Sequence, residues 1–327
     1  MRQWLRRWVV RGALVVVALA LLAVLVHPSH LAICGLMIPV LVLVALLQKT
    51  SGRWRAPALL TLVVLLAIAE RSAFEFAAET VANKKVTYTP HITARLIIDG
   101  PGMAYLEETC PNQEEPTCAL YEALSWSDDP YRLTVSHIIF ERSKELGSFR
   151  LMTPQDQQRV AVGQRDFFIS VLLSQPIATT FAFAENAYQQ LLRYSIWMTV
   201  PTESTLENAR RLARLDDDQL DLIQSGRLTA DRSWIASVTK VHGIIYALSF
   251  GVIAIILLWP GRVPGRIKLF ALLILVGIFT NALVCGGVSQ PADRYGARVM
   301  WLLPFTATFL VLFLPRRRVR PDTGVHA

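Results

Sequence analysis

The chain has 327 residues, of which 53% are hydrophobic, and this is too apolar for an ordinary soluble domain. Its 33 Lys and Arg against 25 Asp and Glu give a net charge of +8, a balance that can indicate nucleic-acid binding. The positions of the charges argue against that function, and we expect no nucleic-acid partner. Fourteen basic residues lie on four short segments that flank apolar runs: Arg2, Arg6, Arg7 and Arg11; Lys49, Arg53 and Arg55; Arg262, Arg266 and Lys268; Arg316, Arg317, Arg318 and Arg320.

Three apolar runs near the N-terminus predict membrane helices at residues 12–26, 31–47 and 56–69. A signal peptide is the alternative for the first run, but no small-residue cleavage site is clear after it and the second run begins almost at once. The third run is short, so we expect its helix to continue past Glu70 and Arg71.

Three further apolar runs predict helices at residues 241–259, 269–284 and 299–314. With the N-terminus inside, three crossings place residues 71–240 outside, and three more return the tail, residues 316–327, to the inside. Every basic segment then lies on the cytoplasmic side, as the positive-inside rule requires. We therefore predict a multi-pass bacterial inner-membrane protein with both termini cytoplasmic and one periplasmic domain.

The stretch between the two groups of predicted spans differs from the rest of the chain. From Glu75 to Ile235 it has 15 basic and 22 acidic residues, a net charge of −7, and no single run long and apolar enough to span a bilayer. Helix signals dominate in this stretch. One helix is predicted to begin with Thr153 as its N-cap, Pro154 at the first helical position and Asp156 as an acidic residue in the first turn. Other helices are expected from Pro176 through Phe181, Ala184, Tyr188, Leu191 and Leu192, at 205–215 and at 217–225; residues 132–140 are a possible strand.

The predicted fold is therefore an all-α membrane protein with six transmembrane helices, three on each side of a mostly α-helical periplasmic domain inserted between helices 3 and 4. Within that domain, Cys110 and Cys118 are separated by seven residues. In an oxidising compartment this spacing favours a disulfide over free thiols, and no nearby histidine supports a metal site. We expect neither a metal nor another cofactor.

The segment from His91 to Leu106 contains Gly100-Pro101-Gly102, which forces a turn that serves as a hinge or a ligand loop. Together with the cysteine pair and the stretch Asp293-Arg-Tyr-Gly-Ala-Arg-Val-Met-Trp-Leu-Leu-Pro304, this segment resembles an uncharacterised group of proteobacterial inner-membrane proteins with a periplasmic insert. The resemblance covers most of the chain after Thr89. It implies a Gram-negative inner membrane and carries over no catalytic residue.

Several polar residues are expected at one depth, the periplasmic membrane face, where ionisable groups are costly and often functional. They form either an ion-pair belt that docks the domain onto the helices or a site for a lipid headgroup or other anion, in which two arginines could hold phosphate. The candidates are Glu70, Arg71, Lys240, His242, Asn281, Asp293, Arg294, Tyr295 and Arg298.

No familiar catalytic motif is present in the sequence: Gly-x-Ser-x-Gly, His-Glu-x-x-His, a Walker loop and Gly-x-Gly-x-x-Gly are all missing. The preferred hypothesis is a non-enzymatic protein whose periplasmic domain binds a membrane or periplasmic protein in a cell-envelope assembly. The alternative is an enzyme or carrier that handles a lipid-linked envelope precursor at the outer leaflet, with Arg294 and Arg298 on its phosphate.

Overall fold

The structure is a computed structural model, and every regular element that it describes is a helix. The prediction of a possible strand at residues 132–140 is wrong for residues 135–140, because these form helix α7 (Val135–Phe140). The chain divides into two compact units, one made of residues 1–192 and 280–292 and the other of residues 193–279 and 293–327. The described residues are 2–83, 85–110, 115–124, 134–144, 146–199, 216–226, 231–261 and 263–314.

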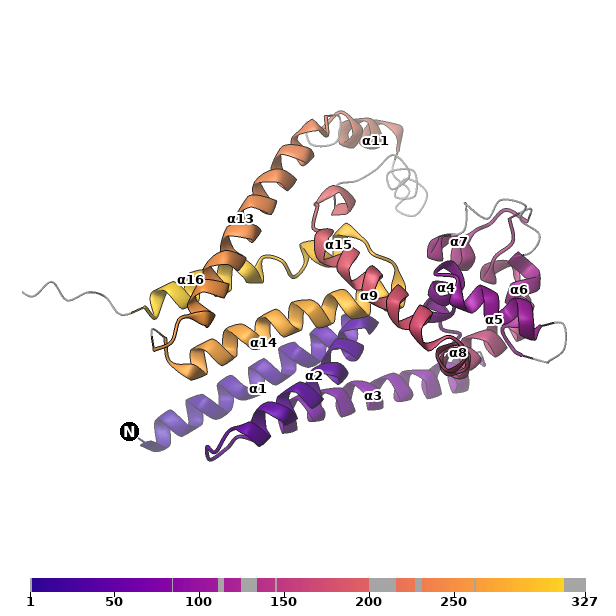
Figure 1. The fold of residues 1–327 in the computed structure, drawn as a ribbon. Helices are drawn as coiled ribbons and strands as arrows, with labels where there is room; N and C mark the ends of the chain where they lie inside the picture. Colours follow the sequence, from indigo (N-terminus) through magenta and orange to yellow (C-terminus); the bar gives the residue numbers. More distant parts are fainter. Residues whose placement is uncertain are drawn as a thin grey trace, which may run out of the picture. The chain divides into compact units, whose positions relative to one another are not determined.

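The first unit begins with three long helices that pack side by side (Figure 1): α1 (Arg2–Val26), α2 (Pro28–Leu47) and α3 (Arg55–Ala82). Pro28 occupies the first turn of α2, where its missing N–H costs nothing, and the His27 side chain caps that turn. Helix α3 ends at Asn83, whose left-handed backbone stops the helix. As expected, α3 continues beyond Arg71, by eleven residues to Ala82.

Five helices of the described chain are long and apolar enough to cross a membrane, which supports a multi-pass membrane protein. The first predicted span is represented by a shorter apolar helix, Leu14–Val26. A further candidate crossing is obtained if α8 (Pro154–Ser174) and α9 (Pro176–Leu192), which meet at a bend of 114°, are counted as one broken span. The five are Ser29–Leu47, Arg55–Ala82, Ser233–Leu258, Gly265–Ser289 and Asp293–Leu312.

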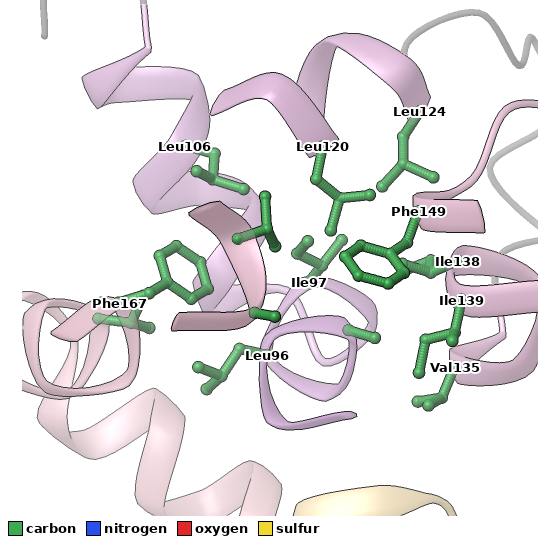
Figure 2. Packing of buried hydrophobic residues seen from close by; sticks show 14 residues of the cluster. Leu96, Ile97, Leu106, Leu120, Leu124, Val135, Ile138, Ile139, Phe149 and Phe167 are labelled. Carbon is green, nitrogen blue, oxygen red and sulfur yellow. The ribbon is translucent and has the colours of Figure 1, made fainter. Parts of the chain in front are cut away.

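A small helical globule follows α3 in the first unit. It contains α4 (His91–Ile98), α5 (Pro101–Thr109), α6 (Cys118–Leu124), α7, the 3₁₀ turn η2 (Phe149–Leu151) and α8. Figure 2 shows its core, in which Leu96, Leu106, Leu120, Ile138 and Phe167 come from five different helices and are fully buried. This apolar core holds α4, α5, α6 and α7 together, since none of these four helices is long enough to be stable alone.

The Gly-Pro-Gly turn joins α4 to α5 at close quarters. Gly100 has φ = 101°, a conformation that L side chains rarely adopt, and Pro101 starts α5. A Cβ at Gly102 would lie 2.6 Å from the Leu96 carbonyl carbon, so only glycine allows the two helices to approach this closely. Cys110 and Cys118 form the predicted disulfide, which ties the end of α5 to the start of α6.

The last parts of the first unit are α9 and η4 (Leu283–Ser289), a π-helical segment that continues a long apolar helix. The two pack tightly, because a Cβ at Gly286 would lie 2.5 Å from the Asn186 carbonyl oxygen. The predicted cap of α8 is confirmed: the Thr153 hydroxyl accepts a hydrogen bond from the Asp156 N–H at 3.2 Å.

The second unit contains η3 (Trp197–Thr199), α11 (Asp217–Gln224), α13 (Ser233–Leu258), most of α14 (Gly265–Ala282), α15 (Asp293–Ala297) and α16 (Leu302–Leu312). Helices α13 and α16 pack against each other. The helix predicted at 217–225 is confirmed, with Asp216 and Gln219 in a capping box. The helix predicted at 205–215 lies outside the described residues.

Candidate functional site

The nine polar residues predicted at the periplasmic membrane face fall into two groups, one in each compact unit. Glu70, Arg71 and Asn281 belong to the first unit. The other six candidates belong to the second unit: Lys240, His242, Asp293, Arg294, Tyr295 and Arg298.

In the second unit, Lys240 and Asp293 line one cavity of about 600 Å³ that is broadly open to the surface. The cavity lies at the start of α13, between the first turns of that helix, the segment before η3 and the start of α15. Its lining combines polar, cationic and apolar side chains: Tyr194, Ser195, Trp197, Arg232, Ile235, Ala236, Thr239, Lys240 and Asp293.

Ser195 connects the walls of this cavity. Its hydroxyl lies 3.0 Å from the Thr239 hydroxyl on α13, and it accepts a hydrogen bond from the Trp197 N–H at 3.1 Å. The Ser195 N–H donates to the Asp293 carboxylate at 3.2 Å. A Cβ at Gly296 would lie 1.8 Å from the Arg193 carbonyl oxygen, so a glycine is required for α15 to lie against this segment.

Two cationic side chains line the cavity. The guanidinium carbon of Arg232 lies 5.4 Å from the centre of the Trp197 ring, a cation–π arrangement that fixes the arginine near the cavity. Lys240 is exposed, and its ammonium group can move to meet a ligand. Just before the helix, the Asp231 carboxylate accepts a hydrogen bond from the Ser233 N–H at 2.8 Å, and this bond lowers the pKa of Asp231.

Arg294 and Arg298 lie close to each other, as expected for residues four apart. Each guanidinium carbon lies 4.9 Å from the centre of the buried Tyr295 ring. Arg294 also donates to the Tyr295 hydroxyl at 3.0 Å, and Arg298 donates to the Arg294 carbonyl at 3.2 Å. The two cations are therefore held together near Asp293, which immediately precedes Arg294 in the chain and lines the cavity.

His242 lies one turn or less beyond the cavity on α13 and belongs to an aromatic group. Its ring centre is 5.8 Å from that of Tyr246, whose ring meets Tyr194 edge-on at 5.3 Å. Gly243 makes room for Tyr194, because a Cβ there would lie 2.4 Å from the Tyr194 hydroxyl oxygen. The geometry gives His242 a packing contact and does not place it among the cavity-lining residues.

In the first unit, Glu70 and Arg71 line a smaller, mainly apolar pocket of about 310 Å³ with Phe74 and Tyr88. The Arg71 guanidinium carbon lies 3.8 Å from the Tyr88 ring centre, and Arg71 pairs with Glu75 at 3.2 Å. The Tyr88 hydroxyl donates to Glu75 at 2.5 Å. Burial, and then this hydrogen bond, raise the pKa of Tyr88.

Asn281 is buried in α14, where its side-chain oxygen accepts a hydrogen bond from the Cys285 thiol at 3.6 Å. This interaction joins two turns of one continuous apolar helical segment. Among the described residues, no group of three or more His, Cys, Asp or Glu side chains could hold a metal ion.

The sequence reasoning did not identify a buried polar cluster in the first unit. Arg95 pairs with Asp99 one turn later in α4, and Asn186 from α9 donates to the other carboxylate oxygen of Asp99 at 2.8 Å. Burial raises the pKa of Asp99, while the bonds from Arg95 and Asn186 oppose that shift. The Arg95–Asp99 spacing of four in a helix is a sequence signal for the ion pair, but nothing local indicates Asn186.

Ser195, Trp197 and Arg232 were also not identified as site residues. They reach the cavity from separate segments, and only their proximity in the fold reveals the grouping. Comparisons with protein-family models, with curated proteins and with solved structures found no match to this chain, so the site is interpreted from its own geometry.

Proposed function

We propose that this multi-pass membrane protein binds an anionic lipid headgroup in the cavity at the start of α13. The observation that carries the proposal is the presence of Arg232 and Lys240 in a 600 Å³ cavity at the end of a candidate membrane span. A phosphate group pairs well with guanidinium and ammonium donors. Placement at the end of a span brings such a site to the depth at which headgroups lie.

The rest of the lining suits an amphiphilic ligand. Ser195 and Thr239 offer hydroxyls, while Trp197, Ile235 and Ala236 offer apolar contact. The cavity also lies at the N-terminal end of α13, which is the positive end of its helix dipole. Arg294 and Arg298 extend the positive charge beyond Asp293. We assign binding of the lipid rather than a reaction on it.

The proposed compartment is the bacterial inner membrane, with both termini in the cytoplasm and residues 71–240 in the periplasm. Support comes from the basic segments, which all lie on one side when six crossings are counted from a cytoplasmic N-terminus. The disulfide is also typical of an oxidising compartment. In this orientation the cavity faces the outer leaflet.

The test compares the full-length protein with the double variant Arg232→Gln, Lys240→Gln, and with Lys144→Gln as a control at an exposed site in the first unit. Binding of phosphatidylglycerol in detergent is measured by native mass spectrometry. Because a hydrogen bond to a charged group contributes about 1.5–3 kcal/mol, we expect at least about a ten-fold loss of affinity in the double variant and none in the control. Phosphatidylcholine and inorganic phosphate are run in parallel to separate a lipid headgroup from a free anion.

The second candidate is a periplasmic domain that binds another membrane or periplasmic protein. It is favoured by the last turns of α3, where Phe74 and Val81 lie one heptad apart on one face and are strongly exposed. Such a face suits a partner helix. The same experiment distinguishes the two candidates, because a protein-binding role predicts that the double variant retains lipid as the wild type does.

A further inference from the structure

Helix α9 has an unusual distribution of side chains. Ile177, Phe181, Ala184, Tyr188 and Leu192 recur at helical spacing and fall within an arc of about 80° at 3.6 residues per turn. All five are exposed, with 79% exposure for Ile177 and 76% for Phe181. One continuous face of α9 is therefore apolar and uncovered.

The opposite face of α9 is buried and carries three polar side chains. Thr179, Asn186 and Gln190 are each at most 7% exposed and lie beside buried Ala187 and half-buried Phe183. Asn186 binds Asp99, and the Gln190 side chain makes two hydrogen bonds to the Ala292 backbone, donating at 3.1 Å and accepting at 2.8 Å. A water-facing helix shows the reverse pattern, with its apolar side buried. Polar side chains turned inward and apolar ones outward are the arrangement expected for a helix in contact with lipid.

The packing of α9 places it beside the apolar spans. It lies on η4, which is the last part of the candidate span Gly265–Ser289. Two glycines allow the contact, since a Cβ at Gly286 or Gly287 would collide with Asn186 or Phe183 of α9. Thr280, just before η4, in turn contacts Met37 of α2, another candidate span. Helix α9 thus packs beside segments that are long and apolar enough to span a membrane.

Two further polar side chains of α9 make hydrogen bonds within the helix. Glu185 is its one acidic or basic residue, and it accepts a hydrogen bond from Gln189 at 3.0 Å on the flank of the apolar face. The Thr180 hydroxyl donates to the Pro176 carbonyl at 2.7 Å. Taken together, α8 and α9 also pass the hydropathy criterion for a broken span or a re-entrant segment.

From these observations we infer that α9 is seated in the bilayer, with its apolar face against the acyl chains. The occupant of this face is lipid, and α9 is a membrane element within the stretch 71–240 that the sequence assigns to the periplasm. The inference does not rest on the headgroup cavity. Every residue used in the inference belongs to the first unit, whereas the cavity lies in the second.

The test attaches a nitroxide label to Phe181→Cys or Tyr188→Cys in the full-length protein, with Cys34 and Cys285 replaced by alanine. The protein is placed in vesicles of phosphatidylethanolamine and phosphatidylglycerol. Gln155→Cys on the exposed first turn of α8 is the water reference, and Leu248→Cys on α13 is the lipid reference. Collision rates with oxygen, which concentrates in lipid, and with a polar nickel chelate, which stays in water, are measured by electron paramagnetic resonance.

Labels on α9 should give a high oxygen rate and a low nickel rate, matching Leu248→Cys. Alkylation of the unlabelled cysteines should also be at least about ten-fold slower than at Gln155→Cys, because the reactive thiolate does not form in lipid. A nickel rate as high as at Gln155→Cys would overturn the inference in favour of water. Low rates for both reagents would overturn it in favour of protein, either another part of the chain or a partner.

Discussion

Replacing Arg95 with alanine is expected to destabilise the first unit by about 3–5 kcal/mol, the usual cost of leaving a buried partner charge uncompensated. Arg95 and Asp99 are both nearly inaccessible, with side-chain exposures of 8% and 9%. Asp99 would keep only the bond from Asn186, which cannot supply the missing positive charge. The loss is measured by unfolding of the purified protein in detergent at neutral pH.

The same variant should show a distinct pH dependence. Burial already raises the pKa of Asp99, and removing Arg95 removes contributions that lower it. The folded-state pKa of the variant therefore lies further above the unfolded value, and its deficit grows as the pH rises through that pKa and shrinks in acid. Adding Asp99→Asn should restore part of the stability at neutral pH. Arg142→Ala, at an exposed site, should change stability by less than about 0.5 kcal/mol; equal losses in Arg95→Ala and Arg142→Ala would contradict the ion-pair account.

Gly286→Ala is expected to cost about 1–3 kcal/mol by overpacking. The new methyl group would lie 2.5 Å from the Asn186 carbonyl oxygen and 2.7 Å from Gln190 Cβ, and the nearest of these atoms belongs to backbone that cannot rotate away. The expected result is a lower unfolding midpoint in detergent and weaker attachment of α9 to η4. As this attachment weakens, the cleavage of α9 by added protease should become faster.

Gly277→Ala is the matched control, nine residues earlier along the same apolar helical segment. Nothing lies within 4 Å of a Cβ at Gly277, so alanine should be neutral or stabilising by up to about 1 kcal/mol, the difference in helix propensity. If both variants lose the same stability, close packing of α9 on η4 is not the reason that Gly286 is required.

The candidate membrane helices could be predicted from sequence, because a long apolar run has few alternatives to crossing a bilayer. The extension of α3 was predicted because the third apolar run is short, and the Thr153 cap was predicted from the residues that follow it. The possible strand at 132–140 rested on the β-branched residues of this segment. Thr134 instead caps α7, accepting a hydrogen bond from the His137 N–H at 3.2 Å, and local capping outweighs strand propensity.

The candidate site was less accessible to sequence reasoning. Lys240 and Asp293 were selected for their expected depth, and the cavity brings them together with Trp197, nearly a hundred residues before Asp293. No periodic pattern encodes such a long-range meeting. For α9, the spacing of its apolar residues predicts the helix but leaves open whether that face meets protein or lipid, because the same stripe serves both.

Placing the stretch from residue 71 to α8 outside the cytoplasm underlies the proposed orientation of the protein, and reporter fusions test it most directly. Alkaline phosphatase, which is active only outside the cytoplasm, is fused after Gln155 at the start of α8, and separately after Gly52 in the turn between α2 and α3. We predict activity after Gln155 and none after Gly52, with the opposite pattern for green fluorescent protein. Activity after Gly52 and none after Gln155 would contradict the proposed orientation and move the cavity to the cytoplasmic leaflet.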